Sequence, residues 1–234
     1  MKTNEKIDLA GNLLNFISDN NTYSDLEDVR SITIDSIAQS VQSFLISIIL
    51  SKELENIDYV QAKIYDKYTS ADLETLGHNF DGFIKDAVFT KLFISTEINF
   101  RTIARHLEAN PDSINKTSIK ATFEKLLDTN VTNLFSTIDA YEKDIIIYFF
   151  YLRNTIHNVG IHTNPNHSIE IEDKTSVINT AKVKLELIEN QTNNINYKDS
   201  LLLFEQVIKV LIKFNSLLPV GQQIKHPLAD FGYN

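Results

Sequence analysis

The sequence predicts an all-α protein built as a helical bundle. Glycine and proline are scarce, at 6 and 4 of 234 residues, and no proline precedes Pro111. Sheet proteins such as sandwiches and barrels need many turns, and turns use these two residues. Apolar residues also recur at intervals of three and four along most of the chain, which is the period of a helix with one buried face. We therefore expect long helices packed around a shared core.

Apolar residues at helical spacing divide the first half of the chain into consecutive helices. In the first helix Leu9, Leu13 and Ile17 share one face. The predicted ranges are Asp8–Asn20, Val29–Glu53, Ile57–Tyr68, a short helix behind a cap at Thr69–Glu74, and Phe83–Leu107. Gly82 weakly interrupts the pattern, and Asn110-Pro111-Asp112 is expected to end the last of these helices.

The second half mixes helices with one segment of a different pattern. Helices are predicted over Ser118–Leu127, Ile138–Asn158 and Lys198–Leu218, with Gly160 and Pro219 as stops. Between the last two, His167–Glu172 and Lys182–Leu187 alternate polar and apolar residues, so a small β-hairpin is expected near residues 165–190. Residues 1–219 are predicted to form a single helical domain, with 220–234 as a loosely attached C-terminal tail.

Charge and cysteine content exclude several classes of protein. With 22 Lys+Arg against 31 Asp+Glu the net charge is −9, so the chain lacks the basic surface of a protein that coats DNA and has no DNA-specific signal. It has no cysteine, which excludes disulfides and thiolate metal sites. The apolar runs Phe44–Leu50 and Ile145–Leu152 are shorter than the ~20 residues of a membrane helix. We expect a cytoplasmic protein that does not span a membrane.

The familiar catalytic motifs are absent from the sequence. It contains neither a glycine-rich phosphate loop nor the HExxH and GxSxG patterns. His157, His162 and His167 recur every five residues, but this spacing does not align ligands on one helix, and Gly160 interrupts it. Solvated loop histidines are the favoured interpretation, and we expect no metal and no cofactor.

A ladder of charged residues lies on the helix predicted over Phe83–Leu107. Glu97, Arg101 and Arg105 follow one another at intervals of four. Such residues are neighbours on a helix surface, so they indicate either ion pairs that support the helix or a basic edge of a cleft. In the second case Arg101 and Arg105 would bind substrate.

The most unusual segment is the end of the helix predicted over Ile138–Asn158. From Tyr148 to His162 it has the sequence YFFYLRNTIHNVGIH. At 100° per residue, Arg153 and His157 share a helix face that borders the apolar stripe. A cation at this border is partly desolvated, which is costly without a compensating role. Arg153 therefore either stabilises the carboxyl end of the helix or serves a function.

The hexapeptide Arg153-Asn154-Thr155-Ile156-His157-Asn158 resembles the signature of HEPN-domain proteins. These are all-α bundles found as toxins, abortive-infection proteins and ribonucleases. Their signature has an arginine, often followed by a polar residue, and a histidine after four to six intervening residues. Here three residues separate Arg153 from His157, a spacing that still places the two side by side on a helix. The resemblance implies a HEPN-like helical bundle.

The resemblance also implies a bacterial defence or toxin protein that cleaves RNA without a metal. His157 would move a proton of the ribose 2′-hydroxyl or of the leaving 5′-oxygen, and Arg153 would stabilise charge on the phosphate. Asn154 would hold the histidine or the phosphate, so these three are the candidate catalytic residues.

Asn158, Arg101 and Arg105 complete the candidate site as substrate-binding residues. HEPN proteins combine two motifs across a dimer cleft, so RNA, a second copy of the chain and an antitoxin are the implied partners. The alternative is a non-catalytic helical interaction or RNA-binding module, in which Arg153 and His157 are structural.

Overall fold

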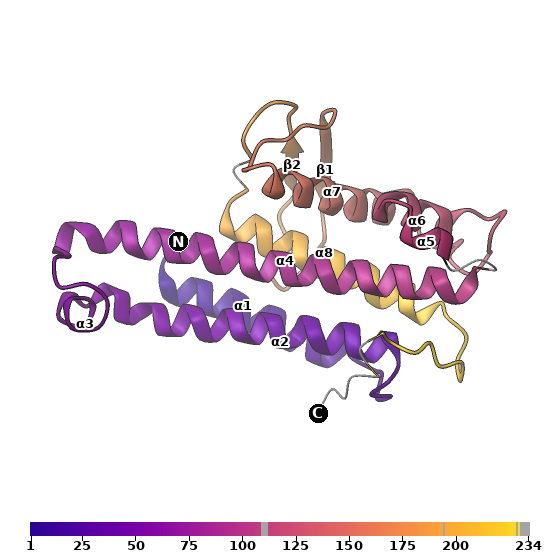
Figure 1. Cartoon of the computed structure of the whole chain (residues 1–234), viewed down its shortest axis with the longest axis horizontal. Coiled ribbons are helices and arrows are strands. Elements are labelled where there is room, and N and C mark those ends of the chain that lie inside the picture. Colours follow the sequence, from indigo (N-terminus) through magenta and orange to yellow (C-terminus); the bar gives the residue numbers. More distant parts are fainter. Residues whose placement is uncertain (109–111, 194, 228, 230–234) are drawn as a thin grey trace.

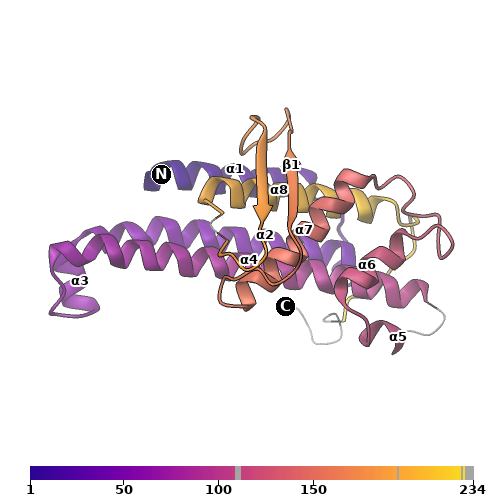
Figure 2. The ribbon, with the colours of Figure 1, turned by 90° about the horizontal axis from the view of Figure 1, so that it is seen from above.

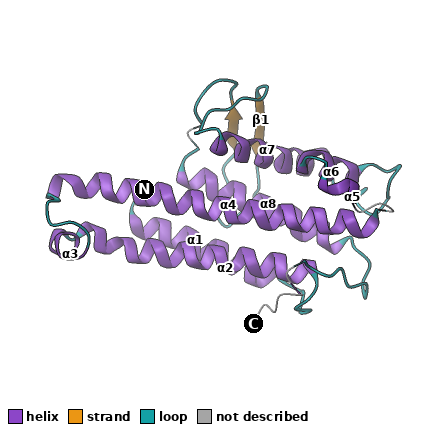
Figure 3. Cartoon of the chain, viewed as in Figure 1, coloured by secondary structure: helices purple, strands orange, loops and turns teal. Residues whose placement is uncertain are grey.

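The computed structural model describes residues 1–108, 112–193, 195–227 and 229. The chain is mostly helical, at 63%, and the described residues form eight α-helices and one small antiparallel sheet (Figure 3). The predicted all-α class and the predicted hairpin are both confirmed. Asn110 and Pro111, the expected stop after the long central helix, lie outside the described residues.

The described elements follow one another along the chain in the order α1 to α7, β1, β2 and α8. The helices are α1 (Thr3–Asn20), α2 (Val29–Leu50), α3 (Ile57–Lys63), α4 (Leu73–Leu107), α5 (Asp112–Asn115), α6 (Ile119–Leu127), α7 (Ala140–His157) and α8 (Tyr197–Ser216), and the strands are β1 (His167–Ile171) and β2 (Val183–Leu187). The helices α1, α2, α4 and α8 form an elongated bundle, and α7 lies on α4 and α8 with the hairpin above it (Figures 1 and 2).

The longest helix differs from its prediction. A short helix and a separate helix from Phe83 were expected, but α4 runs without a break over 35 residues, through both Gly77 and Gly82. Each glycine costs about 1 kcal/mol in a helix interior. Burial of Phe80 and Ile84 against the core on either side of Gly82 offsets that cost.

The two strands pair as their alternation predicts. His167 is opposite Leu187 and Ile171 is opposite Val183 in an antiparallel register. One face of the hairpin buries its apolar residues Ile169, Ile171, Leu185 and Leu187. The other face is polar and exposed, which is the arrangement that one-sided packing of a sheet on a helix requires.

A buried ion network fastens the loop between the strands to α8. Glu205 is completely buried, accepts the Val177 N–H at 3.0 Å, and pairs with Lys209 at 2.8 Å. Lys209 also pairs with Asp173 of the loop. Burial alone would raise the pKa of the Asp173 carboxyl, but the hydrogen bonds from Lys209 and Gln206 lower it well below its usual range. The network therefore places a carboxyl group on each side of one lysine.

The expectation of a loosely attached tail is wrong for residues 222–226. Ile224 is 2% exposed, and its carbonyl accepts the Val29 N–H at 2.8 Å. Asp28 accepts the Ile224 N–H at 3.0 Å and also pairs with Arg30 at 2.7 Å. The tail thus adds an extended segment to the start of α2, where the chain has free backbone groups. Residues 228 and 230–234 lie outside the described residues.

Replacement of Ile224 by alanine is expected to lower the free energy of unfolding by about 2 kcal/mol, because it removes a buried side chain and leaves a cavity. Urea denaturation of the full chain measures this change. Val220→Ala is the matched control in the same segment, since Val220 is fully exposed. Equal stabilities of the two variants would contradict docking of the tail.

One helical stretch of the described residues, Val29–Glu55, is long and apolar enough to cross a membrane by length and composition. It includes α2, whose residues Ile34, Val41 and Ile48 belong to the buried core. The core helix of a soluble protein has the same properties. The length of apolar runs in the sequence did not reveal this stretch, because polar residues such as Ser43 and Ser47 divide it.

Candidate functional site

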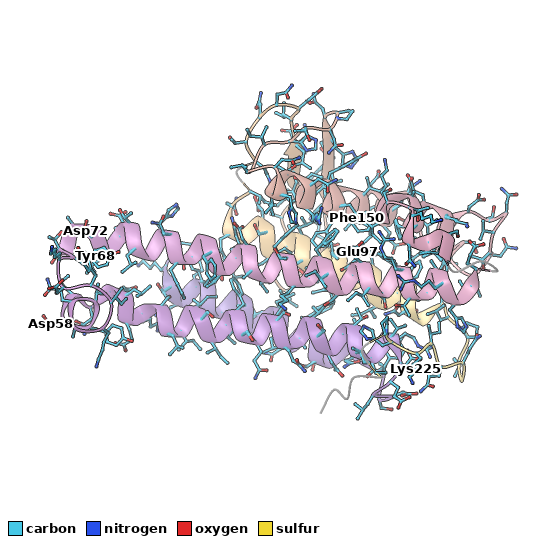
Figure 4. All side chains as sticks on the ribbon, in the orientation of Figure 1. Asp58, Tyr68, Asp72, Glu97, Phe150 and Lys225 are labelled. Atoms are coloured by element: carbon cyan, nitrogen blue, oxygen red, sulfur yellow. The ribbon has the colours of Figure 1, made fainter. Side chains whose placement is uncertain are left out.

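The last two turns of α7 form one wall of a groove against α4. The groove has a volume of about 170 Å³, and we call it the motif groove. Its lining includes Phe93, Ile94 and Glu97 of α4 and Arg153, Ile156 and His157 of α7. Glu97 lies on the part of α4 that faces α7 (Figure 4). The prediction that Arg153 and His157 share a helix face is confirmed.

Capping residues fix both ends of α7. At the start, Asp139 and Glu142 form a reciprocal capping box. At the end, Gly160 has a φ of 83° and donates its N–H to the Thr155 carbonyl at 2.9 Å, which is the left-handed stop expected of glycine. Val159 also has a positive φ, 57°, and is 91% exposed. A β-branched residue in this conformation is strained, so a tight turn follows directly after the motif.

Arg153 extends over an aromatic ring and uses few of its donors. Its guanidinium carbon lies 5.1 Å from the centroid of the Phe93 ring. Its Nη1 donates a long hydrogen bond of 3.3 Å to Asn154, and its buried Nε has no partner. In the described part of the chain Arg153 forms no ion pair, whereas Glu97 of the same groove pairs with Arg101. Arg153 therefore retains hydrogen-bond donors for an anion.

His157 is exposed at the end of α7, one turn after Arg153. Its imidazole makes no hydrogen bond to any residue that the structure describes. Asn158 is used at the helix end, where its N–H donates to the Asn154 carbonyl at 3.0 Å and its side chain donates to Thr163 at 3.0 Å. Asn154 contacts Arg153, and Asn158 closes the turn after α7. The end of α7 therefore brings together Arg153, Asn154, His157 and Asn158.

Arg101 and Arg105 hold α5 against the end of α4. Arg101 pairs with Glu97 at 2.7 Å and donates to the Ile114 carbonyl at 2.9 Å. Arg105 donates to Asn115 at 2.6 Å. The ion-pair interpretation is confirmed for Glu97 and Arg101. Neither arginine lines the motif groove, so their role in substrate binding stays a prediction that no contact supports.

The expectation of solvated loop histidines is wrong for His162. It is completely buried, with Nδ1 2.8 Å from the Thr155 hydroxyl and Nε2 3.1 Å from the Pro165 carbonyl. His162 thereby ties the loop after α7 back to the helix. No pattern in the sequence indicates this bond, because it joins residues seven apart across a turn.

His167 is half-buried at the start of β1. Its ring lies 5.3 Å from the ring of Tyr151 and 6.0 Å from that of Tyr148, and burial lowers the pKa of the His167 imidazole. Among the described residues, no group of three or more His, Asp and Glu side chains is placed to hold a metal ion.

A larger pocket adjoins the motif groove, and the two share Phe89 and Ile156. Its volume is about 410 Å³, and we call it the α8 pocket because Phe204 of α8 forms part of its lining. Lys85 of α4 and Asn193 of the loop before α8 also line it. Sequence reasoning missed this pocket, since its residues come from three segments that are far apart in the chain.

No model of a protein family, no curated protein and no solved structure matches the chain. The function of the site therefore has to follow from its own chemistry. That chemistry is an arginine with free donors and an exposed imidazole in one groove, beside a pocket with an aromatic lining.

Proposed function

We propose that the chain is a HEPN-like, metal-independent endoribonuclease of a bacterial defence or toxin system. The observation that supports this most directly is the state of Arg153. It is held over Phe93 in the motif groove and pairs with no carboxylate among the residues that the structure describes, in a chain with nine more acidic than basic residues. An arginine with free donors binds phosphate in a forked geometry. His157 lines the same groove and supplies a group that transfers protons.

The proposed reaction uses a base, an acid and a cation together with the RNA itself. His157 takes the proton of the ribose 2′-hydroxyl, and the 2′-oxygen forms a bond to phosphorus. The bond from phosphorus to the 5′-oxygen breaks, and that oxygen takes up a proton from an imidazolium. Arg153 stabilises the additional negative charge on the phosphate in the transition state. The products are a 2′,3′-cyclic phosphate and a 5′-hydroxyl.

A homodimer would supply the second proton-transfer group. One chain brings one histidine to the groove, while the reaction uses a base and an acid. Exposed aliphatic side chains surround the motif: Ile94 is 43% exposed, Val159 91% and Ile161 42%. Burial of this apolar surface against a second copy would place two motif grooves across one cleft. An antitoxin is the other partner that this role implies.

A non-catalytic RNA-binding or interaction module is the second candidate. One observation favours it: Phe93 and Asn154 hold Arg153 in place by contacts within the chain, and Arg153 makes no hydrogen bond to His157 among the described residues. In that case RNA would bind at the groove and remain intact.

Incubation of the full chain with end-labelled single-stranded RNA in EDTA tests the proposal. We expect cleavage that leaves 2′,3′-cyclic phosphate and 5′-hydroxyl ends, from a protein that sediments as two chains rather than as one of 26.7 kDa. Arg153→Ala should lower the cleavage rate by about 10²–10³-fold. Lys91→Ala is the control, since it removes a positive charge of α4 that lines neither the motif groove nor the α8 pocket.

Two results would reject this function. Cleavage that requires Mg²⁺ and persists in Arg153→Ala would place the active site elsewhere. RNA that binds but stays intact under all metal conditions would favour the non-catalytic module.

A further inference from the structure

The outer edge of β2 takes no part in the reaction proposed above. The hairpin projects above α7 (Figure 1), and β1 is the one strand of the described chain that pairs with β2. On the other side of β2, no backbone group of another described segment hydrogen-bonds to Val183–Leu187. The unpaired N–H and C=O groups of such an edge can pair with a strand of another chain. None of these residues lines the motif groove, so the edge and the candidate site are separate.

Few features protect this edge from another strand. The strand β2 contains no proline, and its register with β1 runs through five pairs without a bulge. Its outward charges are one lysine and one glutamate, Lys184 and Glu186, whose side chains are 53% and 50% exposed. On β1 the uncharged Ser168 lies opposite Glu186. Because the two charges have opposite signs, the edge favours a strand that carries the same charges in reverse order.

A second copy of β2 presents the charges in that order. In an antiparallel pair centred on Leu185, Lys184 of each copy lies opposite Glu186 of the other. A register shifted by two residues would place Lys184 or Glu186 opposite the same residue of the other copy, and like charges directly opposite destabilise a sheet. A shift by one residue would turn the apolar side chains of the second copy to the solvent face. The charges and the alternation therefore select one register.

The apolar face of β2 is compatible with the same register. Leu185 and Leu187 are 4% and 1% exposed because they pack on their own chain, and Val183 is half-buried beside them. A pair centred on Leu185 places Val183 of each copy opposite Leu187 of the other. The apolar layer under the hairpin then continues across the contact, and the charges remain on the solvent face.

We propose that β2 pairs with the β2 strand of a second copy of the chain, antiparallel and centred on Leu185, in a four-stranded sheet. A two-fold axis makes this contact self-complementary and limits it to two copies. The inference does not rest on the proposed function, because the contact lies outside the motif groove. A chain that also forms the homodimer proposed at the motif would use two different surfaces, and its assemblies would exceed two copies.

Sedimentation equilibrium of the full chain over the micromolar range tests the charge pairing. An Ile94→Glu background removes the apolar contact proposed at the motif, so the remaining self-association reports the β2 edge. Glu186→Lys should raise the dissociation constant about thirtyfold, because it turns two symmetry-related pairs from opposite to like charge. Lys184→Glu combined with Glu186→Lys should restore the association, since it only exchanges the two charges. Glu172→Lys is the control, because it makes the same change of charge on an exposed residue outside both strands.

Engineered cysteines test the register, because the chain has none of its own. Chains with Lys184→Cys are mixed with chains with Glu186→Cys under mild oxidation. In the proposed register these two positions are directly opposite, with Cβ atoms about 4.5–5.5 Å apart, whereas each position is only a diagonal neighbour of its own copy, at roughly 7–8 Å. A disulfide needs close Cβ atoms, so the mixed pair should form faster than either identical pair.

Three results would overturn the contact. The first is a chain that stays monomeric throughout the micromolar range in the Ile94→Glu background. The second is self-association that Glu186→Lys weakens no more than Glu172→Lys does, or that the double exchange fails to restore. The third is formation of mixed and identical disulfides at equal rates.

Discussion

Replacement of His157 by alanine is expected to lower the rate of RNA cleavage by about 10²–10⁴-fold, the range for a lost proton-transfer group. The melting temperature should stay that of the unmodified chain, because His157 is exposed and holds no described residue by a hydrogen bond. Single-turnover cleavage of a labelled RNA in EDTA gives the rate, and circular dichroism gives the melting temperature. His78→Ala is the matched control, since His78 is an exposed histidine of α4 outside the motif groove.

Two substitutions of Arg153 add a more specific test in the same cleavage assay. Arg153→Ala should cost about 3–4 kcal/mol of transition-state stabilisation, and Arg153→Lys should recover only part of it because the ammonium lacks the planar fork. A cleavage rate that falls equally in His78→Ala and His157→Ala would contradict the assignment. So would a His157→Ala variant that has lost its folded structure, since the side chain would then be a packing residue.

Replacement of Lys209 by methionine is expected to lower the free energy of unfolding by about 3 kcal/mol. The methionine keeps most of the apolar volume of the side chain but removes the only cation paired with the fully buried Glu205 in the described structure. An unpaired buried carboxylate is the costly result of breaking a buried ion pair, at about 3–5 kcal/mol. The lower figure applies because Lys209 remains 26% exposed. Urea denaturation at pH 7 measures the change.

A second substitution separates loss of charge pairing from loss of packing. The double variant Glu205→Gln with Lys209→Met should recover much of the lost stability, since no buried charge is left without a partner. Lys184→Met is the surface control, because the pair of Lys184 and Glu186 is half exposed on both sides. If the double variant is no more stable than Lys209→Met, packing rather than charge explains the effect.

The network around Lys209 also bears on the candidate site. It holds the loop between β1 and β2 against α8, while β1 packs on α7. His162, which precedes β1, bonds to Thr155 inside the motif. The position of the end of α7 therefore depends on the hairpin that follows α7 in the chain. It also depends on the ion pair of Lys209 and Glu205 in α8.

The sequence by itself determined the features that depend on near neighbours. Apolar spacing predicted the helices, and the alternation in His167–Glu172 predicted the hairpin together with its buried face. The interval of four between Arg153 and His157 placed them on one helix face, and the structure confirms it. Gly160 ended α7 as predicted. Each of these follows from local geometry, which a short stretch of residues fixes through its own backbone periods.

Only the tertiary structure decided the contacts between distant segments. The helix α4 continues through Gly82, because burial of the residues on both sides outweighs the low helix propensity of glycine. The tertiary structure also docked Ile224 on the start of α2, buried His162, and formed the α8 pocket that includes Asn193. These outcomes depend on burial and hydrogen bonding between residues that the chain separates by up to 196 positions. The free energy of such contacts depends on three-dimensional packing. The contacts therefore produce no periodic pattern in the sequence.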